Sequence, residues 1–170
     1  MKNLTFLSLV LFFTFLQFAQ AQPVPDKDTA WTKDLSPETI TGAKFTPDGS
    51  KIVVTTMEKI RVYDTETGEV EKYFDVSNIT NSISCMDISV NNLNIVTGDN
   101  STQVIIWNIK TGDTVKKLVI DGAVASIKYN KIGTEILLTQ FSSSNERIIK
   151  WNILTGDTNH AESEFYLHSI

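Results

Sequence analysis

The sequence predicts an all-β fold assembled from three repeats of a four-stranded antiparallel sheet. The pairs Tyr63-Asp64, Trp107-Asn108 and Trp151-Asn152 recur in register, 44 residues apart each time. A fixed period of this length is typical of propeller blades or of helical arrays. The repeats are rich in Val, Ile, Thr and aromatic residues, with Gly, Asn, Asp and Ser between the apolar runs, which favours strands over helices. The chain shows no apolar stripe at helical spacing. We therefore predict a partial β-propeller of about three blades.

The second repeat shows how one blade is built. Its strands are predicted at residues 82–89, 93–98, 103–109 and 114–120, separated by turns of three or four residues. The third strand, with the sequence "QVIIWNI", is nearly continuous in apolar residues, which indicates burial on both faces. The aromatic residue that ends this strand is predicted to fill the gap between neighbouring blades. The fourth strand is more polar and is expected to be the outer one.

The three repeats divide the chain into blades at about residues 40–78, 82–121 and 122–166, within a propeller segment that spans 40–170. Their structural positions are the aromatic residue, the polar residue after it and the glycine of the next turn. Glycine suits that turn because it adopts positive φ without strain. The nine positions are Tyr63, Asp64, Gly68, Trp107, Asn108, Gly112, Trp151, Asn152 and Gly156.

The segment before the repeats is predicted to have two parts. Residues 1–21 carry one charge, Lys2, then an apolar stretch and the small-x-small sequence at 19–21, which is the pattern of a secretory signal peptide. The apolar stretch is about 16 residues, short of the roughly 20 that a membrane span needs. Residues 22–39 hold three of the four prolines and are predicted to be a linker with one strand around Trp31. The protein is therefore expected to be exported, to the periplasm or outside the cell.

The repeat resembles the WD-repeat β-propeller family. The resemblance rests on the aromatic-Asp/Asn pair that ends the third strand, on the Thr-Gly that follows, and on "FTPDGSK" at 45–51. It covers residues 40 to 158 and implies a protein-interaction or scaffold role. The chain departs from the family in two features. Asp121-Gly122 stands where the family often has Gly-His, and the turns that would hold the family's aspartate are residues 57–58, 99–102 and 142–147. The family's His–Asp hydrogen bond is therefore expected to be absent.

Three blades do not close a ring, because propellers typically use four to eight. Residues 31–35 resemble the outer strand of a blade whose other strands are missing. Three explanations remain open: the chain is a truncated or partial domain, further blades lie on another chain, or identical chains complete each other. The first is favoured.

The charge distribution argues against several partners. The whole chain carries a net charge of −5, and removal of the leader with Lys2 makes it −6. Without a basic cluster, nucleic acid and anionic lipid are not expected partners. No later segment could span a membrane. The single cysteine, Cys85, cannot form an internal disulfide and is expected in the core of a strand.

No catalytic, cofactor-binding or metal-binding residues are predicted. His160 and His168 lie near Glu162 and Glu164, but this group is interpreted as a polar tail. An enzyme of the propeller lactonase or quinoprotein type would need carboxylates and histidines on the innermost strands, where the charged residues are only Lys44, Asp87 and Lys128. The favoured function is a non-catalytic exported module that binds an unidentified protein. The alternatives are a fragment without independent function and a propeller enzyme whose site is not visible.

Overall fold

The structure is a computed structural model, and it describes residues 31–142 and 146–162. The predicted signal peptide, the first part of the linker (residues 22–30) and residues 163–170 lie outside the described residues. In the described ranges the regular elements are strands, and no helix there is long and apolar enough to cross a membrane. The predicted all-β fold is confirmed.

The strands form three antiparallel sheets, each with four strands in chain order. The first blade contains β1 (Ile40–Phe45), β2 (Lys51–Thr56), β3 (Lys59–Asp64) and β4 (Val70–Asp75). The second contains β5 (Ile83–Ile88), β6 (Asn94–Asp99), β7 (Gln103–Asn108) and β8 (Thr114–Val119). The third contains β9 (Ala123–Tyr129), β10 (Glu135–Phe141), β11 (Arg147–Asn152) and β12 (Thr158–Glu162).

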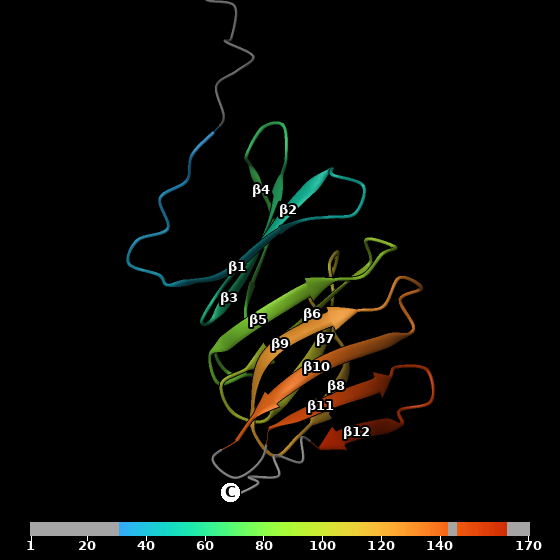
Figure 1. Ribbon diagram of the computed structural model, residues 1–170. Coiled ribbons are helices and arrows are strands. Elements are labelled where there is room, and N and C mark those ends of the chain that lie inside the picture. The colour runs from blue at the N-terminus through green and yellow to red at the C-terminus, as the bar shows by residue number, and fades with distance from the viewer. Residues whose placement is uncertain (1–30, 143–145, 163–170) are drawn as a thin grey trace, which may run out of the picture. The chain divides into compact units, whose positions relative to one another are not determined.

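The blades stack with their first strands next to one another (Figure 1). We call the side of a blade that faces the preceding blade its front face, and the side that faces the following blade its back face. The two central strands of the second blade, β6 and β7, are buried on both faces because a blade lies on each side. The outer strands β4 and β8 are mostly exposed, as their polar sequences predict.

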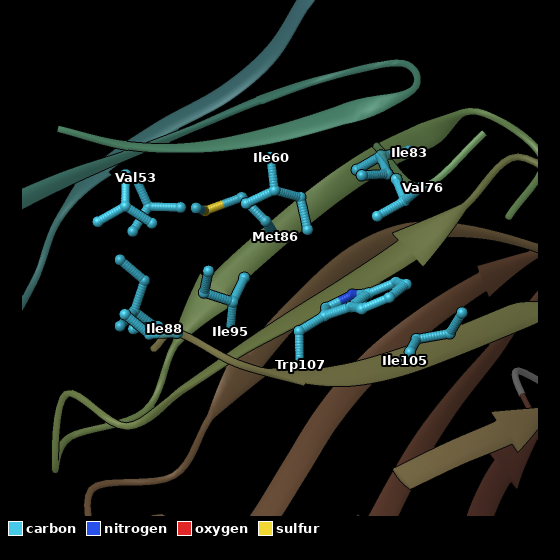
Figure 2. Packing of buried hydrophobic residues seen from close by; sticks show 11 residues of the cluster. Val53, Ile60, Val76, Ile83, Met86, Ile88, Ile95, Ile105 and Trp107 are labelled. Atoms are coloured by element: carbon cyan, nitrogen blue, oxygen red, sulfur yellow. The ribbon is translucent and has the colours of Figure 1, made fainter. Parts of the chain in front are cut away.

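Two apolar clusters lie between the blades. Trp107 and Ile105 on the front face of the second blade pack against Val53 and Ile60 on the back face of the first (Figure 2). The second cluster joins the back face of the second blade to the front face of the third, where Ile149 and Trp151 come from β11. Alternate residues of β7 thus enter different clusters, which is why its sequence is an unbroken apolar run.

One local feature differs from the expectations and another agrees with them. Residues 31–39 form no strand, so the outer strand expected at residues 31–35 is not formed in this structure. The fourth strand of the third repeat is present as β12 and pairs with β11 along Arg147–Trp151, as three four-stranded blades require.

Candidate functional site

The polar residue that ends each third strand forms the turn that follows it. The side-chain oxygens of Asp64, Asn108 and Asn152 accept hydrogen bonds from the backbone N–H groups two and three residues later, at 2.8 to 3.2 Å. The turn needs only an acceptor oxygen at this position, so aspartate and asparagine serve equally. In Asp64 these bonds hold the carboxyl pKa below its usual range, the bond from the Thr67 backbone first.

The glycines of these turns have the backbone conformation that the sequence predicted for them. Each donates its N–H to the carbonyl of the Asp or Asn four residues earlier, at 2.8 to 3.0 Å. All three have positive φ, +68° at Gly68, +79° at Gly112 and +87° at Gly156. Gly112 also lies against the first blade, because a Cβ atom placed there would be 2.2 Å from the Phe74 ring.

Two of the three predicted aromatic positions lie between blades. Trp107 belongs to the first inter-blade cluster and Trp151 to the second. The indole N–H of Trp107 donates to the buried hydroxyl of Thr97 at 2.8 Å. Tyr63 is also buried, but it belongs to neither cluster, because it lies on the front face of the first blade.

The innermost strands carry a polar connection across all three blades. Asp87 on β5 accepts a hydrogen bond from the Lys44 ammonium of the first blade at 2.5 Å. Its other carboxylate oxygen accepts the backbone N–H of Tyr129 in the third blade at 2.8 Å. Nearby, the Ser84 hydroxyl donates to the carbonyl of Val124 at 2.7 Å. Both oxygens of the Asp87 carboxylate therefore bind groups of the neighbouring blades.

The structural role of Asp99, a buried carboxylate in the second blade, was not predicted from the sequence. Asp99 is fully buried, and one of its oxygens accepts three backbone N–H bonds in the turn between β6 and β7. The other oxygen accepts the Thr80 hydroxyl and the Asn81 backbone N–H, both at 3.1 Å. Thr80 therefore supplies the side-chain donor for which the sequence has no histidine. The sequence did hold a signal for this contact: an aspartate lies in a turn, and a hydroxyl residue lies in the inter-blade link before it.

In the third blade, different residues form the hydrogen bonds between a buried side chain of the blade and the link that precedes it. The buried Gln140 amide donates to Asp121 in the preceding link at 2.5 Å, and Arg147 forms an ion pair with the same carboxylate at 2.9 Å. These bonds, with that of Gln140 first, hold the pKa of Asp121 below its usual range. Beside this ion pair runs a groove of about 280 Å³, lined by Leu118–Asp121 of the second blade and by Arg147, Ile149, Thr158 and His160 of the third.

The segment before β1 is held to the first blade by an ion cluster. Glu38 bonds both terminal nitrogens of Arg61 at 2.7 and 2.8 Å, and Lys59 at 2.7 Å. The hydrogen bonds from Arg61, and next those from Lys59, lower the pKa of Glu38 to about 2. Arg61 also lies over the Tyr73 ring, 5.4 Å from its centre.

The turns at one end of the blades expose apolar side chains. This end carries the turns between first and second strands and between third and fourth strands. We define its apolar patch as Val90, Leu93, Ile132 and Leu154, of which Ile132 and Leu154 are 77% and 72% exposed. Val90 of the second blade approaches the Gly133 turn of the third, so the patch crosses a blade boundary.

The groups considered for metal binding are not brought together in the described part of the chain. His160 is exposed on β12, while His168 and Glu164 lie outside the described residues. Residues 31–142 and 146–162 contain no cluster of three or more His, Cys, Asp or Glu side chains that could hold a metal ion. Cys85 is partly buried, and burial raises the pKa of its thiol.

Comparison with solved structures identifies the fold. The chain matches the WD40 repeats of RRP9 with a TM-score of 0.65 at 18% identity, over 77% of this chain and 40% of that one. It matches the β-propeller domain of Cps50 (Swd1) from Myceliophteria thermophila with a TM-score of 0.60 at 12% identity, over 79% and 41%. No protein-family model matches the sequence, and no curated protein matches it by sequence.

A third match shows that the fold does not select an activity. Hydrazine synthase from Kuenenia stuttgartiensis matches with a TM-score of 0.68 at 13% identity, over 81% of this chain and 39% of that one. The chain is thus about as similar in structure to an enzyme as to WD40-repeat proteins, so its function must be argued from the site. The chain spans about two fifths of the length of these structures.

Proposed function

The three blades have the fold of a WD-repeat β-propeller, and we propose that the protein is an exported, non-catalytic module that binds another protein. The observation that carries this proposal is the apolar patch at the turn end of the blades. Apolar side chains on turns gain little for the fold when solvent surrounds them, and contiguous exposed apolar surface marks interaction sites. The patch lies on short turns held by side-chain hydrogen bonds, so it is presented rigidly, and little ordering is needed on binding.

The chemistry of the innermost strands favours binding over catalysis. Asp87 is the acidic residue that the sequence placed there, and its two oxygens are used by Lys44 and by the Tyr129 backbone. A catalytic carboxylate would need a free oxygen aimed at a substrate. The proposed function therefore uses the turn end of the blades rather than their innermost strands.

The binding proposal is tested by affinity capture with matched variants. The wild-type protein, the double variant Ile132→Asp with Leu154→Asp, and the control Lys131→Gln are used to capture proteins from the source organism. We expect a partner that the control retains and that the double variant loses by about tenfold or more, since apolar anchors dominate interface energies. A double variant that captures the same proteins as the control would contradict a role for the patch.

Export is tested separately. The leader pattern supports cleavage after Ala21. We expect the protein in the periplasmic or extracellular fraction with Gln22 at its N-terminus, measured by cell fractionation and N-terminal sequencing. An uncleaved protein recovered with the cytoplasm would contradict this part of the proposal.

A further inference from the structure

The outer strands of the blades differ in how well their free edges are protected. Within the described residues, β4, β8 and β12 each have no partner strand on the outer side of the sheet (Figure 1). Such an edge is a template for pairing with another chain, and natural proteins protect it with lysines, other charged side chains and bulges. Glu71 and Lys72 stand near the middle of β4, and Lys116 and Lys117 in the middle of β8. Both strands also have a shift of register against the third strand of their blade, so they are protected edges.

β12 has neither form of protection. Its sequence, "TNHAE", contains no lysine or arginine, and its acidic residue, Glu162, stands at the end. It pairs with β11 in one continuous register, from Arg147 opposite Glu162 to Trp151 opposite Thr158. β12 is therefore the outer edge best suited to accept a further strand from an extended peptide, whose main chain would form the hydrogen bonds.

The groove of about 280 Å³ lies on the face of β12 that is turned toward the second blade, and we call it the outer groove. Leu118, Ile120 and Ile149 supply apolar lining, and Thr158 and His160 line it from β12. On an added strand, the side chain opposite His160 would point to the same face, with its Cβ atom about 4.5–5.5 Å from that of His160. An extended peptide on the edge of β12 would thus place every second side chain at the mouth of the outer groove.

The boundary between the first two blades shows what fills the equivalent space there. Phe74 of β4 and Leu118 of β8 occupy the same position, one repeat apart, and both pack on the apolar cluster toward the following blade. The Phe74 ring reaches the turn of the second blade, where a Cβ atom on Gly112 would lie 2.2 Å from it. At Gly156, the equivalent glycine of the third blade, a Cβ atom would meet nothing within 4 Å. The shorter Leu118 therefore leaves open a space that an aromatic ring fills at the first boundary.

Contacts between the two blades on either side of Leu118 hold the outer groove open. On one side Arg147 forms its ion pair with Asp121, and on the other the Lys116 ammonium donates a hydrogen bond to the carbonyl of Ile153. A site of fixed shape needs little ordering on binding. The volume of about 280 Å³ is below the roughly 300–1,000 Å³ of pockets for small molecules and cofactors. These dimensions suit one large side chain rather than a whole small-molecule ligand.

From the unprotected edge and the open space beside it, we infer that β12 and the outer groove bind an extended peptide segment of another protein, which adds a strand to β12 and inserts a large aromatic side chain into the groove. In this mode the main chain supplies affinity and the groove selects the side chain. A second copy of this chain that paired through its own β12 would bring only the small or polar side chains of "TNHAE" and would leave the groove without an apolar occupant. The site is separate from the apolar patch, so the inference does not rest on the function proposed for that patch.

The test uses four short peptides and the ¹⁵N-labelled protein. The probe is acetyl-Thr-Val-Phe-Val-Thr-amide, in which phenylalanine and the two threonines share one face of the strand. A second peptide has alanine in place of phenylalanine. Two more are N-methylated on alternate residues, because alternate N–H groups point to opposite edges of a strand. Backbone amide shifts locate the bound peptide, and their concentration dependence gives the dissociation constant.

We expect the largest shifts from the probe in β12 and at residues 118–121. The alanine peptide should bind about tenfold or more weakly, since a buried aromatic anchor dominates such an interface. One of the two methylated peptides should lose binding, because only one edge of the added strand pairs with β12.

Two variants of the protein separate the groove from the edge. Leu118→Phe supplies the ring that fills this space at the first boundary, and it should weaken binding of the probe by about tenfold or more. Val115→Phe adds the same ring to β8 outside the lining of the groove, and it should bind the probe as the wild type does. Urea midpoints show whether both variants are folded, and the comparison of the phenylalanine and alanine peptides on the wild-type protein does not depend on either variant.

Several results would overturn the inference. No amide shift with the probe at about 1 mM would mean that the site has no useful affinity for such a segment. Shifts confined to β4 or β8 would place the peptide on another edge. Equal binding of the probe and the alanine peptide, or of the probe to folded Leu118→Phe and to wild type, would remove the role of the groove. Equal binding of both methylated peptides would remove strand addition. Amide shifts in β12 that depend on protein concentration without peptide, together with a sedimenting dimer, would make a second copy the occupant.

Discussion

Replacement of Trp107 by alanine tests the central claim that the blades are held together by their apolar faces. The side chain is 1% exposed and packs in the cluster between the first two blades. Truncation of a buried Trp to Ala costs about 3–5 kcal/mol. The indole N–H also bonds the buried Thr97 hydroxyl, and an unsatisfied buried partner adds about 1–3 kcal/mol. We expect a loss of about 4–8 kcal/mol in the free energy of unfolding. Domains have about 5–15 kcal/mol in total, so the variant should be close to unfolded.

Urea unfolding followed by far-UV circular dichroism measures this loss without depending on tryptophan fluorescence. Trp107→Phe keeps an aromatic ring but loses the N–H donor, and should lose about 1–3 kcal/mol. Leu154→Ala, at a side chain that is 72% exposed, is the control and should stay within about 0.5 kcal/mol of wild type. A loss below about 1.5 kcal/mol for Trp107→Ala would refute the assignment of this residue to a packed blade interface.

Three further predictions concern the ions and turns. The pKa of Glu38 is about 2 in the folded protein against 4.5 ordinarily, so the ionised carboxylate contributes its full stabilisation of the fold above pH 4.5 and loses it as pH falls toward 2. The urea midpoint of Glu38→Gln should lack this part of the fall with pH. Gly156→Ala should cost about 1–2 kcal/mol because its φ is positive, and Gly112→Ala about 1–3 kcal/mol more because its Cβ also meets a ring of the first blade; equal thermal shifts would contradict this. Asp87→Ala should lower the free energy of unfolding by about 1–3 kcal/mol, because it leaves a buried N–H unsatisfied, and Lys44→Ala, at a partly exposed amine, by about 1 kcal/mol or less. A chemical denaturation series in which Asp87→Ala loses no more than Lys44→Ala would contradict the importance of the inner-strand connection.

The repeat and the strands could be predicted because their causes are local. The turn after each third strand is made by a side-chain oxygen and N–H groups two and three residues away, so "D-T-E-T-G" and "N-I-K-T-G" specify it without help from the rest of the fold. Burial of the central strands was visible in their unbroken apolar runs. The predicted outer strand at residues 31–35 had no such local cause, only a likeness in layout to a later segment, and it is not formed.

The contacts between blades depended on the tertiary structure. Lys44 meets Asp87, and Thr80 meets Asp99, only because the blades and links stack so that positions far apart in the sequence coincide. The sequence identified the charged residues of the innermost strands but could not tell a pair from a free group. By itself the sequence determined the repeat, the strands and the turns, since these follow from periodicity and short-range hydrogen bonds. The tertiary structure alone decided which faces are covered and which remain exposed, because burial depends on what packs against a blade.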